Sequence, residues 1–592
     1  MKVIKRMAAI FLTGCLLCNL VGCGTADYEN IRLEDNYYQY INKDALMEYD
    51  ASGIVGEDAY DLENMQKIVD REVYALIKDV VKCDVEYEPG SNEQLVREAY
   101  QQAEKFLQTG RCEQNEEFAK VKNEILQAHS LTELTRIMEF LYNEKQINCF
   151  LSYPCSCYED GNDDAGVSLP FGDVESGVGG FLFRGISDWE KDRERFRNYV
   201  NALAMSLDEE GSVLHADKFC NTIEEYSELY GKQYEENWQT FQSENGIYDE
   251  LKYFSQQLYR YFNEEHLDII KMFILCDVMY AWSDYLYLEY PFLAEYKKVQ
   301  DVNSEDMAVA ITMLNVSEPV SELYESQYYT EEMDAMIKRV YEDVRNSYKQ
   351  LVESSSWLSE SGKKYILERL DRLTLETNGQ GKMIPDLELA EERDRMISYQ
   401  VNAHYSRKNH SILISTAIMH YPYFDEHADY EKMLGTLGFF VAHEMGHSLA
   451  TEFLYGFFLD TKGVSMKDEQ VFEQIRDDLE EYYSGYKIFD QYAVDGRMTL
   501  EENYADILAF ECLLNLVKEP EKQKVMMESY CNLMVKRMSE EDKIEKTIKD
   551  VHSPGEIRVN AVLSSMDSFY ELYDIKPEDG MYVEKEKRIH IF

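Results

Sequence analysis

The residues best suited to catalytic chemistry are two histidines, His443 and His447, with Glu444 directly after the first. Residues 433–442, which precede them, are mostly apolar and predict a buried helix. On a helix, positions i and i+4 lie one turn apart on the same face, so both imidazoles would point to one spot. Two nitrogens at that spacing are half of a tetrahedral zinc site, and Glu444 would project beside the metal as a general base. The alternative is a buried helix whose two histidines form ordinary hydrogen bonds.

A carboxylate that could complete this site lies farther along the chain. Glu502 and Asp506 are also four positions apart, so they share a helix face. Glu502 would give a His₂Glu ligand set with a fourth position free for water, and Asp506 would fix the tautomer of a ligand histidine. The alternative is a capping box, because Thr499 and Glu502 have the spacing at which the glutamate satisfies only a backbone N–H. From spacing alone, both interpretations stay open.

A predicted hairpin precedes the histidine helix. Two short strands at 401–405 and 411–415 enclose a polar turn. The edge of such a sheet can bind an extended peptide, and Asn402 could then hold the substrate main chain through its amide. The hairpin could equally be part of the core without a ligand role.

A Pro-Gly turn near the C-terminus carries His552 on one side and Arg558 on the other, and the two side chains can converge. His552 suits stabilisation of the oxyanion that forms when an amide is hydrolysed. Arg558 suits a substrate carbonyl or a carboxylate such as Asp506. The alternative is a surface turn with a capping arginine.

The elements around these motifs are mostly helical. A chain of 592 residues is too long for one compact core, so more than one domain is expected. Helical spacing dominates from about residue 60 to 373, and a linker candidate follows at 377–381. We therefore expect a mostly helical region at 34–380 and a catalytic region at 381–592.

One long apolar segment, residues 269–293, requires a choice between the membrane and the core. Lys271, Asp277 and Asp284 interrupt it. Charged side chains inside a bilayer are costly, so the segment predicts a buried helix and not a transmembrane one.

The composition is strongly acidic, with a formal net charge of −53. Binding to a phosphate backbone requires a basic surface, so a nucleic-acid partner is not expected. The charge favours solubility and could also attract cationic peptides.

The N-terminus predicts a lipoprotein signal peptide at residues 1–22. Three basic residues precede an apolar stretch, 7–21, which is too short for a comfortable membrane span. The stretch ends in Leu-Val-Gly before Cys23, which resembles a bacterial lipobox. That resemblance implies cleavage before Cys23, lipidation of its thiol and a tether at 23–33. We therefore expect a lipid-anchored protein of the bacterial cell envelope, outside the cytoplasm; a plain secretory signal is the alternative.

The cysteines do not predict a disulfide framework. Of the 12 cysteines, Cys15 and Cys18 fall in the signal peptide and Cys23 is the lipid site, which leaves nine. Nine thiols cannot all pair within the chain, and no paired C-x-x-C motif occurs.

Taken together, these motifs resemble the neprilysin family of zinc metallopeptidases. The stretches that carry the resemblance are V-N-A-H-Y at 401–405, H-E-M-G-H at 443–447, E-N-Y-A-D at 502–506 and D-V-H-S-P-G-E-I-R-V-N at 550–560. The resemblance extends from about residue 34 to the end of the chain. It implies a mainly α protein with a smaller α+β catalytic domain of the thermolysin-like (gluzincin) type. The two lobes would enclose a cavity that admits peptides and excludes folded proteins.

The resemblance also assigns roles to individual residues. The implied ligands of one zinc ion per chain are His443, His447 and Glu502. The implied catalytic residues are Glu444 as base and proton shuttle, Asp506 as the partner of a ligand histidine, and His552 as the oxyanion donor. The implied substrate-binding residues are Asn402, Ala403 and Arg558.

The expected function is that of a membrane-anchored zinc endopeptidase. It would hydrolyse oligopeptides on the amino side of hydrophobic residues, with Glu444 as general base. A catalytically weak peptide-binding surface lipoprotein of the same fold is the alternative. A gluzincin aminopeptidase is disfavoured, because the G-A-M-E-N motif of that group is absent. Departures from the family, such as Ile507-Leu508 in place of a Gly-Gly pair, affect the expected shape of the subsites.

Overall fold

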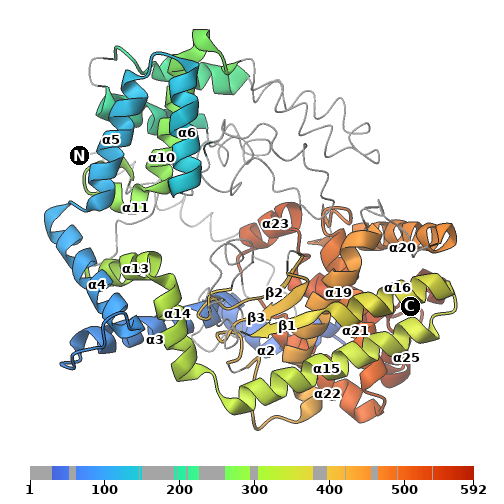
Figure 1. Cartoon of the computed structure of the whole chain (residues 1–592). Helices are drawn as coiled ribbons and strands as arrows, with labels where there is room; N and C mark the ends of the chain where they lie inside the picture. The colour runs from blue at the N-terminus through green and yellow to red at the C-terminus, as the bar shows by residue number, and fades with distance from the viewer. Residues whose placement is uncertain are drawn as a thin grey trace, which may run out of the picture. The chain divides into compact units, whose positions relative to one another are not determined.

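The computed structural model folds into two compact units (Figure 1). One unit comprises residues up to 73 and from 324 onwards, and the other comprises residues 74–323. The structure describes residues 30–52, 62–145, 147, 149, 193–194, 196–208, 211–225, 261–293, 304–377, 396–407, 409–420, 422–454, 465–489, 491–536 and 538–592. The predicted domain boundary at residue 380 lies outside these residues and stays a prediction, as do the signal peptide and Cys23.

The unit of residues 74–323 is helical in its described part. Residues 62–73 of α3 and 324–328 of α14 are counted with the other unit. The bounds are α3 Leu62–Lys82, α4 Asn92–Thr109, α5 Glu113–Gln127, α6 Leu131–Lys145, η3 Glu264–His266, α10 Leu267–Ala281, α11 Ser283–Leu286, α13 Ser304–Asn315 and α14 Ser317–Tyr328.

Helix α10 is the centre of this unit. Its residues Ile269 to Met279 are all buried, in a core that also contains Phe118, Phe219 and Trp282. Its charged Lys271 is buried too, and its Nζ donates to Leu126 O at 2.8 Å. The predicted buried helix is therefore confirmed, but it ends at Ala281 and not at residue 293. Among the described helices, none combines the length and the apolar character needed to cross a bilayer.

The other unit holds all the motifs that predict chemistry. Its helices are α2 Tyr37–Ser52, α15 Glu331–Ser354, α16 Glu360–Arg372, α18 Tyr430–Met433, the π-helical η6 Leu434–Gly438, α19 Phe439–Leu454, α20 Met466–Ser484, α21 Leu500–Leu516, α22 Pro520–Leu533, α23 Glu540–Lys549, α24 Gly555–Ser565, α25 Asp567–Tyr573 and η7 Lys585–Lys587. Its strands are β1 Thr374–Thr377, β2 Ala403–Ser406, β3 Ser411–Ile414, β4 Lys487–Ile488 and β5 Tyr492–Ala493.

The predicted hairpin is present as β2 and β3, which pair antiparallel with Tyr405 opposite Ile412. β3 is buried at every position and lies in the middle of a three-stranded sheet of order β1-β3-β2. Sequence analysis did not predict β1, which pairs parallel with β3. Unlike β2 and β3, it is not joined to its partner strand by a short turn that would reveal the pair. β2 is an edge strand, and two of its backbone N–H groups bond to side chains: Tyr405 N donates to Glu444, and Ala403 N donates to Asn402.

Two helices that carry the predicted metal ligands, α19 and α21, cross at close range. A Cβ at Gly446 of α19 would lie 3.3 Å from the Cα of Ala505 on α21. The absence of that atom, together with the small side chain of Ala505, lets the two backbones approach. Tyr348 of α15 donates from its hydroxyl to Ala442 O of α19 at 2.8 Å. One contact thus holds the helix just before its first ligand, and the other lies between the two histidines.

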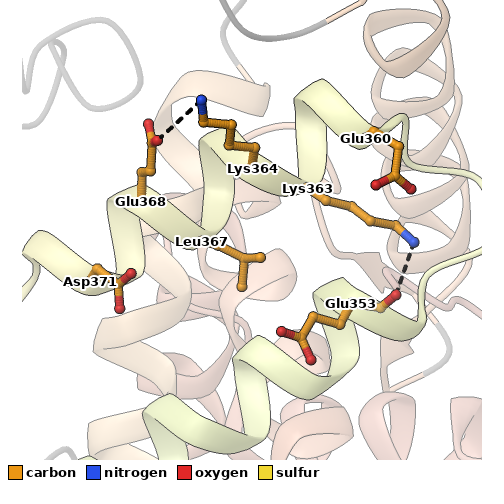
Figure 2. A pocket seen from close by; sticks show the side chains of 7 residues that line it. All are labelled: Glu353, Glu360, Lys363, Lys364, Leu367, Glu368 and Asp371. Carbon is orange, nitrogen blue, oxygen red and sulfur yellow. Dashed lines mark hydrogen bonds and ion pairs between the residues drawn. The ribbon is translucent and has the colours of Figure 1, made fainter.

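A hollow of about 340 Å³ lies between α15 and α16 (Figure 2). Its lining consists of charged side chains and Leu367, and the lysines are already engaged. Lys363 donates to Glu353 O at 2.9 Å, and Lys364 lies 3.7 Å from Glu368. Four carboxylates line this surface feature, but the group of possible metal ligands found among the described residues lies elsewhere.

The described chain is thus mainly helical with two small sheets, as predicted. The cavity expected between two lobes stays a prediction. The cysteines that the structure describes are all free thiols: Cys83, Cys112, Cys149, Cys220, Cys276, Cys512 and Cys531. Within this part of the chain, the expectation of no disulfide framework holds.

Candidate metal centre

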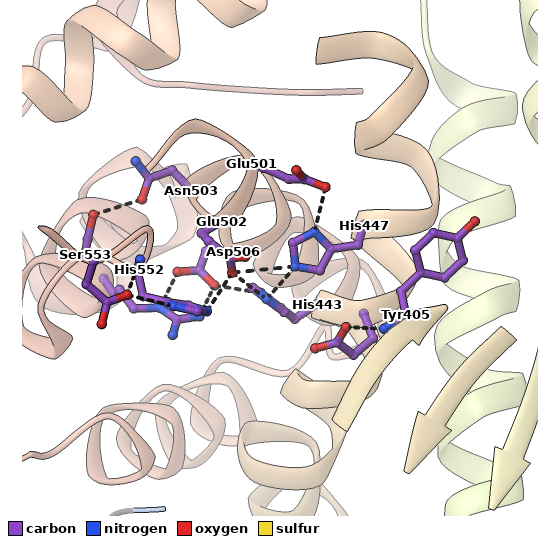
Figure 3. Close-up of polar contacts among 12 residues, drawn as sticks. Tyr405, His443, His447, Glu501, Glu502, Asn503, Asp506, His552 and Ser553 are labelled. Carbon is purple, nitrogen blue, oxygen red and sulfur yellow. Dashed lines mark hydrogen bonds and ion pairs between the residues drawn. The ribbon is translucent and has the colours of Figure 1, made fainter. Parts of the chain in front are cut away.

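Three side chains from two helices converge on one point (Figure 3). His443 and His447 lie on α19, and Glu502 lies in the first turn of α21. The Nε2 atoms of the histidines are 3.0 Å apart, and Glu502 Oε2 lies 3.1 Å from the first and 3.5 Å from the second. Tetrahedral zinc with bonds of about 2.0–2.1 Å places its ligand atoms roughly 3.3–3.4 Å apart. The three observed separations fall close to that spacing, so the three atoms suit a single ion.

Glu502 is placed as a ligand and not as a helix cap. Thr499 is the N-cap residue of α21, but its side chain makes no capping hydrogen bond. Among the described residues, Glu502 Oε2 is buried without a well-directed hydrogen bond, although imidazole nitrogens surround it. A buried carboxylate oxygen in this state costs free energy unless a cation occupies the point that it faces. The capping-box alternative is wrong, and the predicted zinc site of His443, His447 and Glu502 is confirmed.

The electrostatics of the cluster also favour a bound cation. Burial by itself would lower the pKa of His447, but the nearby carboxylates of Glu501 and Glu502 outweigh it and raise the pKa to about 10. Burial would raise the pKa of Glu502, but the surrounding imidazoles hold that pKa far below its usual range. Both shifts show that the cluster stabilises positive charge, which a metal dication can supply in place of protons.

Asp506 lies behind the ligand His443. Its Oδ1 is 2.8 Å from His443 Nδ1, so the Nε2 atom of the same ring faces the metal point. Arg558 donates from Nε and Nη2 to the two oxygens of Asp506, at 2.6 Å each. Burial would raise the pKa of Asp506, but Arg558 and His443 hold it below its usual range. Asp506 therefore makes the contact that its predicted role requires, and Arg558 contacts the carboxylate, one of its two predicted partners.

Comparison with known proteins identifies the family. Two sequence models, both described as peptidase family M13, match residues 186–378 and 402–589, which together exceed half of the chain. The chain belongs to peptidase family M13. This confirms the resemblance to the neprilysin family, and the second matched region contains the metal ligands on α19 and α21.

Relatives of this M13 chain include bacterial neutral endopeptidases. The neutral endopeptidase of Lactococcus lactis subsp. lactis (strain IL1403) is 22% identical over 375 residues, which cover 56% of this chain and 59% of the relative. The neutral endopeptidase of Lactobacillus helveticus is 25% identical over 314 residues, 46% of this chain and 48% of the relative. The matches thus span only about half of each relative's length.

A solved structure resembles the M13 chain over a greater length. The crystal structure of Mycobacterium tuberculosis zinc metalloprotease Zmp1 in complex with an inhibitor has a TM-score of 0.68 and 16% sequence identity. The likeness covers 95% of this chain and 98% of Zmp1. At this identity the comparison shows a shared fold.

The catalytic base predicted for this M13 chain, Glu444, is buried between the zinc helix and the sheet. Its Oε2 accepts a hydrogen bond of 2.7 Å from Tyr405 N on the edge strand β2. The sequence did not predict this contact, because the register of β2 against α19 is a tertiary feature. The contact places the Glu444 carboxylate at the strand edge that we expect a peptide to use.

His552 contacts the same oxygen of Glu502 that faces the two zinc histidines. Its Nε2 is 3.2 Å from Glu502 Oε2, and its Nδ1 is 3.0 Å from Asp550 Oδ1. Burial disfavours the charged ring, but the hydrogen bonds to Asp550 and Glu502 outweigh it and raise the pKa of His552 to about 9. The side chain remains 43% exposed, so its charge is accessible to a ligand. Its role as oxyanion donor stays a prediction.

The predicted substrate residues Asn402 and Ala403 begin the edge strand. Asn402 Oδ1 accepts from Ala403 N at 2.9 Å, and Asn402 O accepts from Ser415 N at 3.2 Å. The side-chain carbonyl of Asn402 is therefore used to shape the strand, which leaves its NH₂ group as the donor for a substrate carbonyl. Binding of substrate by Asn402, Ala403 or Arg558 stays a prediction.

Sequence reasoning missed two carboxylates that contact histidines of this site. Asp550 Oδ1 accepts a hydrogen bond from His552 N at 2.8 Å and also contacts the imidazole ring. Its position two residues before the histidine is a turn signal that the sequence offered. Glu501 Oε1 lies 3.6 Å from His447 Nδ1 and 2.8 Å from Arg407 Nη2. No spacing rule distinguishes Glu501 from its neighbour Glu502 as a partner of the zinc helix.

Proposed function

We propose that this M13 chain is a zinc endopeptidase that hydrolyses oligopeptides. The observation that carries the proposal is the position of Glu444. Its carboxylate belongs to the zinc-ligand helix α19 and accepts a hydrogen bond from Tyr405 N on the edge strand β2. One acidic residue thus connects the metal-binding helix to the strand that an extended peptide would join.

The chemistry divides among a few residues. Bound zinc supplies a Lewis acid that polarises the scissile carbonyl and lowers the pKa of water to roughly 7. Glu444 takes a proton from the attacking water and passes it to the leaving amine. His552, whose Nδ1 lies 3.0 Å from Asp550 Oδ1, donates from Nε2 to the oxyanion that develops on the substrate.

Substrate position follows from the edge of β2. A peptide that pairs with this strand would place its carbonyls near the NH₂ group of Asn402 and the main chain of Ala403. We propose cleavage on the amino side of hydrophobic residues, a preference that rests on the family resemblance.

Attachment to the membrane is proposed from the sequence. A lipid on Cys23 would hold the enzyme at the surface of the bacterial cell envelope, outside the cytoplasm, where it would act on peptides from the surroundings. Metabolic labelling with a fatty-acid analogue tests this point. Label should be present in the wild-type protein and absent after Cys23→Ala substitution.

The test of the activity is to map cleavage sites in a mixed peptide library by mass spectrometry. We expect internal cuts that cease after removal of zinc with a chelator and return when zinc is added back. The matched control is Glu444→Gln, which should bind zinc and lose turnover by several orders of magnitude. Zinc binding without internal cleavage by the wild-type protein would refute the peptidase assignment and favour a peptide-binding lipoprotein.

A further inference from the structure

The two zinc histidines are not supported in the same way. His443 Nδ1 faces the fully buried Asp506 at 2.8 Å, whereas His447 Nδ1 faces Glu501 at 3.6 Å (Figure 3). Glu501 is part of the first turn of α21, directly before the ligand Glu502. The first turn of α21 therefore supplies both the metal ligand Glu502 and the carboxylate of Glu501, which faces the Nδ1 side of the His447 ring.

We propose that Glu501 is a positioning residue for His447 and that Arg407 holds the Glu501 carboxylate in place. The inference rests on the zinc site of the proposed function and concerns only the orientation of one ligand. The carboxylate behind a metal-bound histidine fixes the ring tautomer and its direction, and raises the basicity of the ligand nitrogen. Asp506 has that position for His443, and Glu501 has it for His447.

The distances define what the contact can be. A separation of 3.6 Å is an ion-pair distance and exceeds a hydrogen bond, so the Glu501 contact is looser than that of Asp506. Glu501 is only 24% exposed in its side chain, and a shift of roughly half an ångström would bring its Oε1 into hydrogen-bond range of His447 Nδ1. The Glu501 side chain is held in this position, because Arg407 Nη2 donates to the same oxygen at 2.8 Å.

Arg407 links the pair to the substrate strand. It lies directly after β2 in the turn before β3, and its side chain is 55% exposed. The β2 segment therefore reaches the metal site twice, through Tyr405 N to Glu444 and through Arg407 to Glu501. Strand and metal site would then keep a fixed mutual position when a peptide is bound at the strand edge.

A competing explanation is that Arg407 and Glu501 form an ordinary surface ion pair. Such a pair contributes little to stability, about 0–1 kcal/mol, and does not influence a metal. The chain offers a matched control in Glu521, which also lies in the first turn of a helix, α22, and pairs with Lys524 at 3.0 Å. Glu521 contacts no metal ligand in any described interaction.

The experiment measures zinc affinity on the full-length protein by competition with a chromophoric chelator. Glu501→Ala should weaken zinc binding about 10–100-fold, while the isosteric Glu501→Gln should weaken it less, because an amide oxygen remains behind the ring. Glu521→Gln should leave the affinity within about twofold of wild type. The absorption spectrum of the Co²⁺-substituted protein should change in Glu501→Ala and remain unchanged in Glu521→Gln.

A second measurement isolates Arg407. Arg407→Ala should weaken zinc binding in the wild-type background and have no further effect in Glu501→Ala, because Arg407 acts through that carboxylate. Melting temperatures of the zinc-free variants show whether the fold is retained. If Glu501→Ala does not fold, the comparison between Glu501→Gln and wild type decides.

The outcomes separate this inference from the proposed function. Wild-type zinc affinity and an unchanged cobalt spectrum in Glu501→Ala would overturn the role of Glu501 and leave the peptidase assignment intact. An undiminished effect of Arg407→Ala in the Glu501→Ala background would overturn the role of Arg407. Failure of the wild-type protein to bind zinc would refute the proposed function itself.

Discussion

Replacing Arg558 by methionine should show how much the fold depends on the charge pair behind the zinc site. Asp506 is fully buried and Arg558 is only 15% exposed in its side chain, and two 2.6 Å hydrogen bonds join them. Removing one partner of a buried ion pair leaves the other charge buried without a partner, which costs about 3–5 kcal/mol. Methionine retains much of the arginine's apolar length, so packing loss should add little.

The structure refines this magnitude. Without Arg558, burial would raise the pKa of Asp506, and His443 would be the remaining described charge partner of that carboxylate. Asp506 could then take up a proton, which would reduce the free-energy cost of the buried charge but weaken its interaction with His443. We therefore expect a loss of about 3 kcal/mol, at the lower end of the range, together with weaker zinc binding.

Urea unfolding of the zinc-free protein, followed by the shift in midpoint, measures the effect. Arg476→Met is the control, because Arg476 pairs with Asp477 at the surface and should contribute less than about 1 kcal/mol. The double variant Arg558→Met with Asp506→Asn should recover part of the lost stability, since it leaves no buried carboxylate without its partner. A loss below about 1 kcal/mol for Arg558→Met, or strictly additive losses in the double variant, would refute the argument.

Three other changes test other parts of the unit. Asp468 is buried and accepts hydrogen bonds from Ser359 and from Ser465, the N-cap residue of α20; together they outweigh burial and lower its pKa. Asp468→Asn should therefore destabilise the protein near pH 7, and the difference from wild type should shrink below about pH 4 in thermal melts. A Cβ at Gly555 would lie 2.1 Å from Met534 O, so Gly555→Ala should cost about 1–3 kcal/mol in urea unfolding. His552→Gln should lower kcat about 10²–10³-fold with little change in KM, in steady-state assays on one library peptide.

The sequence predicted the parts of the site that depend on local geometry. The four-residue spacing of His443 and His447 requires only that the segment be helical, and the apolar run before it made that expectation firm. The hairpin followed in the same way from two strands and a polar turn. Strand β1 could not be predicted, because it pairs parallel with a strand farther along the chain and no hairpin turn marks it.

The rest of the site depends on how two helices meet. Thr499 and Glu502 satisfy the spacing of a capping box, and only the crossing of α21 against α19 brings Glu502 to the histidines. The crossing is close because Gly446 and Ala505 are small, a pairing that no single-helix pattern shows.

The same crossing explains why adjacent glutamates have different roles. Consecutive residues on a helix point about 100° apart, so α21 can aim Glu502 at the metal point and Glu501 at the outer side of His447. Sequence spacing assigns no such difference, because both residues are acidic and both lie in the first turn. The position of a second helix is therefore the physical fact that converts an acidic pair into one ligand and one candidate positioning residue.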